Sequence, residues 1–298
     1  MPRLQVPATV TALFVAWLLS GPSAGLAVSQ AQPTLNAVLT RAGEYAVRYG
    51  EELATVLAEE AYTQELVSRA GGATITSRRL RSEIAFIRLN GSTEWWVFRN
   101  VLTIDESPVP ESAGRLERLF HGVSQSFIEQ ARAITAESAR YNLGPLNRQI
   151  NVPTIALHFI HPEHRANSRF EKEGEQYFDG ERVWVVAFRE ERGLLIRRSD
   201  GRSLAARGRL WIAPSDGRVV RSELVVKDFV RGEDSEAVID VSWRRDAGLD
   251  LWVPAEMRER YVGPWSVQSA PKRRERYDIA GVATYSNYRR FSVDVRIR

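Results

Sequence analysis

Three of the four histidines of the chain lie close together, at His158, His161 and His164. Imidazole nitrogens are common zinc ligands, and each must come within about 2.1 Å of the metal. A helix would place the three rings on one side, but Pro162 prevents an uninterrupted helix. On a strand, His158 and His161 would point to opposite faces. We therefore expect a strand over 154–160 that ends in a polar turn, with no bound metal and no other cofactor.

Other catalytic motifs are missing from the sequence. It has no Gly-x-Ser-x-Gly elbow, no Walker loop and no dinucleotide fingerprint. Because the chain has no cysteine, thiol catalysis and cysteine-ligated metals are excluded. A pair of carboxylates for glycoside hydrolysis could still be assembled in space, but the sequence singles out no such pair. We expect a protein that is not an enzyme.

The charge pattern argues against nucleic-acid binding. The net charge is +4, and the many arginines alternate with acids, as in Arg258-Glu259-Arg260. A nucleic-acid surface would gather its basic residues on one face. We interpret the arginines as part of a solvated surface and expect no nucleic-acid partner.

The N-terminus has the three-part pattern of a secretory signal. Arg3 precedes an apolar run over 10–19, and small residues offer cleavage after Ala27 or Ala31. The run is short for a membrane span, although an uncleaved anchor is the alternative. We predict a signal peptide at 1–27, a periplasmic or secreted protein, and no membrane span after signal removal.

The first half of the mature chain mixes helices and a hairpin. Apolar residues at helical spacing predict a helix over 34–66, with Gly50 as its weak point. Two strands, 80–89 and 95–104, flank an Asn90-Gly91 turn. The second of them is apolar on both faces near its start, which suggests that a helix covers one side. A helical insert follows over 111–142.

From residue 151 onward the sequence predicts only strands separated by short turns. We expect them over 154–160, 169–177, 182–190, 207–213, 218–227, 236–244, 251–262 and 280–297. Such spacing is typical of an antiparallel meander, and we predict one domain over 28–298.

Alternation along the last strands suggests a buried polar contact. Tyr285 and Phe291 share the apolar side of their strand with Arg289, and Glu259 shares a side with Met257 and Tyr261. A charge on an inner face needs a partner. One hypothesis is that Glu259 and Arg289 pair inside the concavity; the other is a salt bridge at the rim of the sheet.

The segment Gly208–Leu224 resembles a hairpin of the lipoprotein-carrier superfamily, the periplasmic outer-membrane lipoprotein-sorting proteins and their relatives. In that family a strand ending in W-I-D-P turns through a glycine into x-V-x-R; here Ala213 replaces the acid. The similarity also draws on 252–257 and 285–291. The chain resembles still more closely a set of uncharacterised secreted bacterial proteins that have the same N-terminal helix and the Glu137–Asn142 segment.

This resemblance implies an α+β fold: a strongly curved, unclosed antiparallel half-barrel, with the N-terminal and inserted helices on its concave face. It also implies an apolar cavity that receives acyl chains. The strand tryptophans either line such a pocket or fill a core.

Three functions remain open on these grounds. The first is a monomeric, non-catalytic envelope protein that shelters a lipid, a lipoprotein acyl chain or another apolar ligand. The second is a structural or interaction protein of the envelope, and the third is a metal-dependent hydrolase that uses His158, His161 and His164. For the first we expect these ligand-binding residues: Trp95, Trp184, Met257, Glu259, Tyr261, Tyr285, Arg289 and Phe291.

Overall fold

The computed structural model describes residues 32–88, 95–121, 127–144, 150–198, 200–230, 232–270 and 273–291. Residues Pro33–Arg298 group as one compact unit. The predicted signal peptide and both of its cleavage positions lie outside the described residues.

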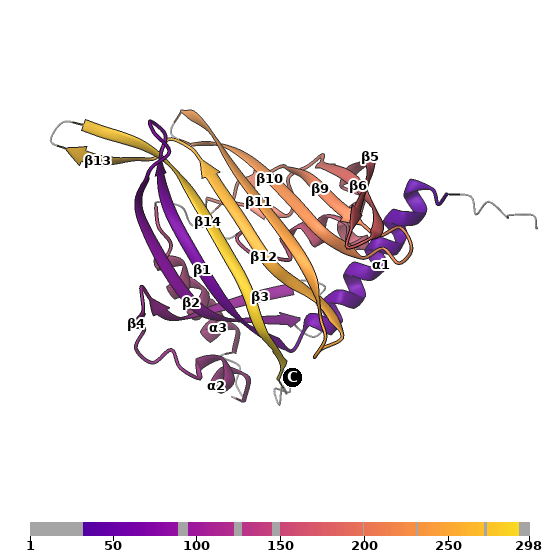
Figure 1. Cartoon of the computed structure of the whole chain (residues 1–298), viewed down its shortest axis with the longest axis horizontal. Coiled ribbons are helices and arrows are strands. Elements are labelled where there is room, and N and C mark those ends of the chain that lie inside the picture. The colour runs from indigo at the N-terminus through magenta and orange to yellow at the C-terminus, as the bar shows by residue number, and fades with distance from the viewer. Residues whose placement is uncertain are drawn as a thin grey trace, which may run out of the picture. The chain divides into compact units, whose positions relative to one another are not determined.

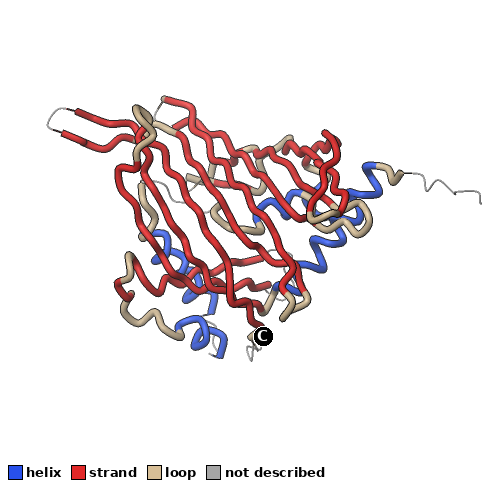
Figure 2. The backbone as a smooth tube through the Cα atoms, in the orientation of Figure 1, coloured by secondary structure: helices blue, strands red, loops and turns tan. Residues whose placement is uncertain are grey.

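One antiparallel sheet dominates the described chain (Figures 1 and 2). Its order is β4-β3-β2-β1-β14-β12-β11-β10-β9-β6-β5, and β13 pairs with β14 beside this path. The order leaves β4 and β5 as separate edges, so the sheet is unclosed. The strands are β1 (Val56–Ser68), β2 (Thr74–Arg88), β3 (Trp95–Ile104), β4 (Ser107–Pro108), β5 (Ser168–Phe178), β6 (Glu181–Glu190), β9 (Ala206–Ile212), β10 (Val219–Val230), β11 (Glu233–Asp246), β12 (Leu251–Val262), β13 (Ser266–Ala270) and β14 (Arg273–Arg290). A separate small ladder joins β7 (Ile196–Arg197) to β8 (Ser203–Leu204). The predicted α+β half-barrel is confirmed.

Helix α1 (Leu35–Leu53) covers one face of this sheet, which we call the inner face (Figure 1). The Thr34 hydroxyl accepts a hydrogen bond from the Ala37 N–H at 3.2 Å and caps the helix. Val38, Ala42 and Ala46 follow one stripe and are fully buried against the strands.

The predicted helix over 34–66 is wrong beyond Leu53. Ala54 is extended and Thr55 has φ 94°, and the chain then enters β1. Burial in β1 alternates: Tyr62 and Leu66 are buried, and Thr63 and Ala61 are exposed. The apolar residues Val56 and Leu57 fit a helix and a strand equally well. The sequence therefore shows no break where helical spacing gives way to strand alternation.

The predicted strand over 154–160 is also wrong. Residues Ile155–Phe159 form a 3₁₀ helix, η1, and Pro162–Arg165 form the short helix α4. Leu157, Phe159 and Ile160 are fully buried against the inner face. The segment fills the concavity beside α1, where side chains must meet the core in several directions rather than on one face of a strand.

The helical insert differs from the expectation in where it packs. Helices α2 (Arg115–His121) and α3 (Phe127–Arg140) contribute Leu116, Leu119 and Ile134 to a cluster with Leu57, Ala85 and Phe98. Leu57 and Ala85 alternate with inner-face residues of β1 and β2, so this cluster lies on the outer face. The strand over 95–104 is apolar on both sides because it is covered on both sides.

The hairpin over Gly208–Leu224 is confirmed, and its loop docks on α1. The Arg41 guanidinium donates a hydrogen bond to the Pro214 carbonyl at 2.8 Å. Gly217 has φ 79°, and a Cβ added there would lie 2.2 Å from the carbonyl carbon of Arg41. This glycine therefore serves both the turn and the close approach of the helix.

Substituting Gly217→Ala should destabilise the protein by about 3 kcal/mol or more, because strain at positive φ adds to a backbone clash. Gly180 has φ 80° with nothing within 4 Å of an added Cβ, so Gly180→Ala is the matched control. It should cost only about 1–2 kcal/mol. Urea unfolding of the three proteins measures both values, and equal losses would contradict the docking role of the hairpin loop.

Candidate functional site

A cluster of polar side chains, buried except for the partly exposed Arg99, lies on the inner face of the sheet. Glu60 comes from β1, Arg99 from β3, and Glu259 and Tyr261 from β12. The Arg99 guanidinium donates to both carboxylate oxygens of Glu60, with Nε–Oε2 at 2.5 Å and Nη2–Oε1 at 2.8 Å. It also donates to the Asn151 carbonyl at 3.1 Å, which ties the covering segment to the sheet. Such a bidentate pair is the strongest geometry available to these two groups.

Glu259 is the second carboxyl group of the cluster. The Tyr261 hydroxyl donates to its Oε2 at 2.8 Å. Burial raises the pKa of Glu259 to about 8; the hydrogen bond from Tyr261 lowers it, and the charge of Glu60 raises it further. Glu259 is therefore protonated and uncharged at neutral pH. Arg99 behaves differently: burial lowers its pKa, but the neighbouring Glu60 carboxylate raises it, and the net effect is a pKa above the usual value.

Gly281 of β14 makes room for this carboxyl group. It pairs with Glu259 on one side and Gln64 on the other. A Cβ at Gly281 would lie 2.7 Å from Glu259 Cγ and 2.9 Å from Tyr62 Cε2. The bare backbone of β14 thus provides the space in which Glu259 and Tyr62 lie against the sheet.

Four of the predicted ligand-binding residues come together here. Met257, Glu259, Tyr261 and Tyr285 are all buried on the inner face, and the Tyr285 hydroxyl lies 3.9 Å from Met257 Sδ. Trp184 is also buried in the inner-face core but belongs to β6, where Lys172 Nζ lies 3.8 Å from the centre of its ring. The side chain of Trp95 lies outside the described residues.

The hypothesis that Glu259 pairs with Arg289 is wrong. Arg289 donates to Glu83 at 2.8 Å, and its neighbour across the ladder is Leu57 of the outer-face cluster. Phe291 packs against that same cluster. The reason is Asn287, whose φ of 51° marks an irregularity that shifts the alternation by one residue.

Glu60, Arg99 and Gln64 belong to the cluster but were not among the predicted site residues. Gln64 is fully buried; its Oε1 accepts from the Leu143 N–H at 2.7 Å. Glu60 and Gln64 both fall inside the helix predicted over 34–66, whereas the structure places them on β1. The alternation Glu60, Tyr62, Gln64, Leu66 was the signal that could have placed all four on one face of a strand.

An apolar pocket of about 640 Å³ opens beside the segment that covers the inner face. Residues of 150–164 line one wall and residues of 194–197 the other: Ile150, Ile155, His164, Leu194, Leu195, Ile196 and Arg197. Buried Glu190 supports the second wall, because its carboxylate accepts from the N–H groups of Leu194 at 2.8 Å and Leu195 at 3.3 Å. The volume of the pocket lies within the range of small-molecule sites.

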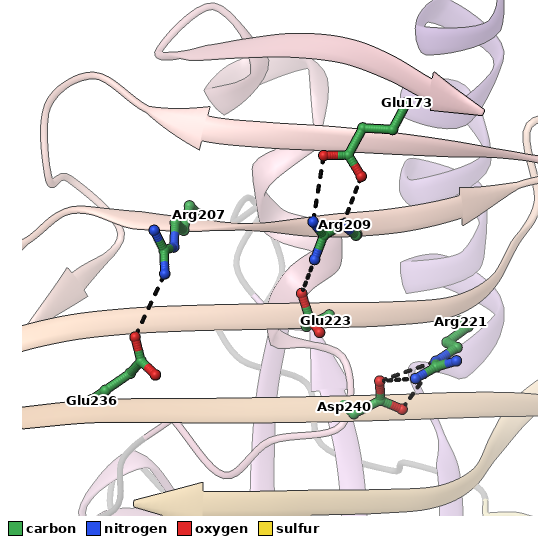
Figure 3. Close-up of polar contacts among 7 residues, drawn as sticks. All are labelled: Glu173, Arg207, Arg209, Arg221, Glu223, Glu236 and Asp240. Carbon is green, nitrogen blue, oxygen red and sulfur yellow. Dashed lines mark hydrogen bonds and ion pairs between the residues drawn. The ribbon is translucent and has the colours of Figure 1, made fainter. Parts of the chain in front are cut away.

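A larger groove of about 1020 Å³ lies over β5, β6, β9, β10 and β11, and it is strongly charged. Arginines and carboxylates alternate across neighbouring strands (Figure 3). Arg209 bonds Glu173 at 2.6 Å and Glu223 at 2.9 Å, and nearby Arg221 bonds Asp240 at 2.6 Å. The charges compensate one another at a solvated surface, so the groove does not suit an apolar ligand.

The histidine segment is folded differently from its prediction. Burial, with the charges of His164 and His161, lowers the pKa of His158 to about 4. His161 is buried and caps α4, and Glu163 and His164 follow on that helix. Ligand atoms of His161, Glu163 and His164 lie within 4.8 Å of one another.

Comparisons with known proteins find similarity only among solved structures. No protein-family model and no curated protein matches the chain. A DUF1329 family protein from Desulfovibrio piger shares 12% identity and a TM-score of 0.38, over 87% of this chain and 95% of that one. A protein from Vibrio parahaemolyticus described as an outer membrane lipoprotein-sorting protein domain shares 10% identity and a TM-score of 0.38, over 85% and 91%. A LolA superfamily protein from Nitrosomonas europaea shares 12% identity and a TM-score of 0.32, over 84% and 94%.

Among the described residues, no helix has the length and apolar character needed to cross a membrane.

The raised pKa of Glu259 should make folding stability depend on pH. Between about pH 4.5 and 8, the unfolded chain releases a proton that the folded chain keeps, so the free energy of unfolding falls as pH rises. The slope from this group approaches about 1.4 kcal/mol per pH unit. Glu259→Gln should remove it. Urea unfolding from pH 5 to 9 measures the slope, with Glu256→Gln on the outer face of β12 as the control that should keep it.

Replacing one partner of the Glu60–Arg99 ion pair should destabilise the protein far more than replacing both. Arg99→Met leaves Glu60 buried without its counter-charge and should cost about 3–5 kcal/mol. The double variant Glu60→Met, Arg99→Met should recover most of that loss. A double-mutant cycle by denaturant unfolding tests this, and additive losses would show that the two charges do not stabilise each other.

Proposed function

We propose that the protein is an exported, non-catalytic envelope protein that binds an apolar ligand, such as a lipid acyl chain, in the pocket between 150–164 and 194–197. The observation that carries the proposal is the lining of this pocket, where five aliphatic side chains gather at the edge of the inner-face layer. Water-exposed aliphatic groups in a concave site gain free energy when an apolar ligand covers them.

The pocket adjoins the buried polar cluster. Ile150 lines the pocket and also packs against the cluster of Leu66, Tyr261 and Ile279. The proposal therefore gives Met257, Glu259, Tyr261 and Tyr285 the role of supporting the pocket from beneath. It assigns no ligand contact to Trp184, Arg289 or Phe291, which lie in other parts of the fold.

The buried carboxyl groups do not support a hydrolase. Glu60 is 2% exposed and Glu259 is 4% exposed, and each is engaged by a neighbouring side chain. A general acid or base must reach within hydrogen-bond distance of its substrate. Glu60 instead holds Arg99, which reaches the Asn151 carbonyl of the covering segment, and Glu259 accepts from Tyr261 on its own strand.

A structural or interaction role on the same scaffold is the second candidate. Its specific support is the filled concavity, where Leu157, Phe159 and Ile160 occupy space that a large internal cavity would need. Both proposals place the protein in the periplasm or outside the cell, on the strength of the predicted signal peptide.

Leu194→Asp tests the pocket, because Leu194 lines it and is 43% exposed, so the change should not impair folding. Binding of a fluorescent fatty acid should weaken at least about tenfold, since burying a carboxylate against an alkyl chain costs more than about 1.4 kcal/mol. Ile75→Asp, at an aliphatic residue 36% exposed on β2, is the control.

Equal fatty-acid affinity in the wild type and both variants would contradict the proposed site. Native mass spectrometry of the protein purified from envelopes gives an independent readout. It should detect a co-purifying lipid with the wild type and less of it with Leu194→Asp. Absence of any lipid, together with no fatty-acid binding, would favour the structural role.

A further inference from the structure

We infer that His161, Glu163 and His164 form a binding site for a zinc-class transition-metal ion. Their ligand atoms lie within 4.8 Å of one another, which makes them the one such group among the residues that the structure describes. Two imidazoles and one carboxylate are a donor set that suits Zn²⁺ and leaves a fourth coordination position open.

The local fold brings the two rings together. His161 is the N-cap of α4, and its Nδ1 accepts from the Glu163 N–H at 3.4 Å. A neutral imidazole has a single lone pair, so a metal ion bound to His161 replaces this long hydrogen bond. Pro162 fixes the first helical residue, which places His164 at the third. Side chains at the N-cap and the third position face each other at a helix start, and the two ring centres are 5.9 Å apart.

Ligands of a tetrahedral zinc ion are about 3.4 Å apart, given metal–ligand distances near 2.1 Å. Glu163 is exposed and His164 is partly exposed, so both side chains have room to rotate toward that separation. His161, which is 5% exposed, provides the fixed ligand.

The backbone beneath the site is closely packed against α1. Phe159 and Ile160 are fully buried immediately before His161. Gly43 of α1 approaches so closely that an added Cβ would lie 3.2 Å from the Ile160 carbonyl oxygen and 3.4 Å from Pro162 Cγ. Arg165 also donates to the Thr40 hydroxyl at 3.3 Å, so α4 is fastened to α1 at both ends. A preorganised backbone lowers the entropy cost of gathering three ligands.

The site is distinct from the apolar pocket in chemistry but shares one residue with it, since His164 also lines the pocket. The proposal does not depend on an apolar ligand. A metal ion binds these three side chains whether or not the pocket is filled, and the two can be tested separately.

The experiment uses the full chain without a polyhistidine tag, freed of metal with a chelator. Isothermal titration with ZnCl₂ should show one ion bound per chain. His164→Ala and Glu163→Gln should each weaken binding at least about tenfold, as loss of a ligand costs no less than loss of an outer partner. His121→Ala, which removes the histidine outside this segment, is the matched control and should leave the titration unchanged.

Cobalt(II) gives a second readout. Its visible absorption reports coordination by protein ligands, and the signal should be reduced in His164→Ala and retained in His121→Ala. Thermal unfolding without metal should be the same in all four proteins, which separates ligand loss from misfolding. No zinc uptake by the wild type, or uptake unchanged in both His164→Ala and Glu163→Gln, would overturn the inference.

Discussion

The burial of the inner face of the sheet is the constraint on which the rest of the structure depends. An unclosed sheet has an apolar face that water must not reach, and here α1 and η1 cover it. Tyr49 and Trp243 are fully buried where helix and sheet meet, and the Trp243 Nε1 donates to the Tyr49 hydroxyl at 3.2 Å. The hairpin loop at 213–218 and the segment at 160–165 then fix α1 from two directions.

The covering layer also explains the polar cluster. Glu60, Arg99 and Glu259 lie on strands that the layer hides from water, so each charge must be neutralised within the protein. Arg99 neutralises Glu60, and no second cation is needed if Glu259 keeps its proton. Because Arg99 also reaches the Asn151 carbonyl, the same guanidinium holds the chain that crosses above it. A buried pair of this kind adds little net stability but allows few alternative packings.

Much of the sheet could be predicted from the sequence because turn chemistry and alternation are local signals. The Gly208–Leu224 hairpin and the strands around it were found this way. Two kinds of residue could not be placed. Residues 56–66 have apolar spacing that fits a helix and a strand, and pairing with β14, more than two hundred residues later, decides between them. Residues 154–160 are apolar without a period, and only the concavity that they fill determines their shape.

The site depended even more on distant pairing. The alternation of Met257, Glu259 and Tyr261 predicted one face of β12 correctly, but Glu60 and Arg99 come from strands far away in sequence. The irregularity at Asn287 moved Arg289 to the outer face, and a shift of one residue has no signature in composition. The three histidines, in contrast, are close in sequence, and the backbone conformation decides whether their rings lie near one another. On a strand their rings would diverge, whereas the start of α4 turns His161 and His164 toward each other.

The layer that covers the inner face of the sheet also carries both proposed binding sites. Where it runs from Ile150 to His164, its inner side supports the core and its outer edge meets the wall at 194–197. Glu190 holds that wall through backbone N–H groups, so the wall keeps its shape without filling the space in front of it. The aliphatic residues that the covering segment gives to the pocket and the proposed metal ligands therefore lie along the same edge of that segment. The contacts that hold α4 against α1 also orient His161 and His164. The docking of α1 therefore both stabilises the covering layer and sets the geometry of the two proposed binding sites.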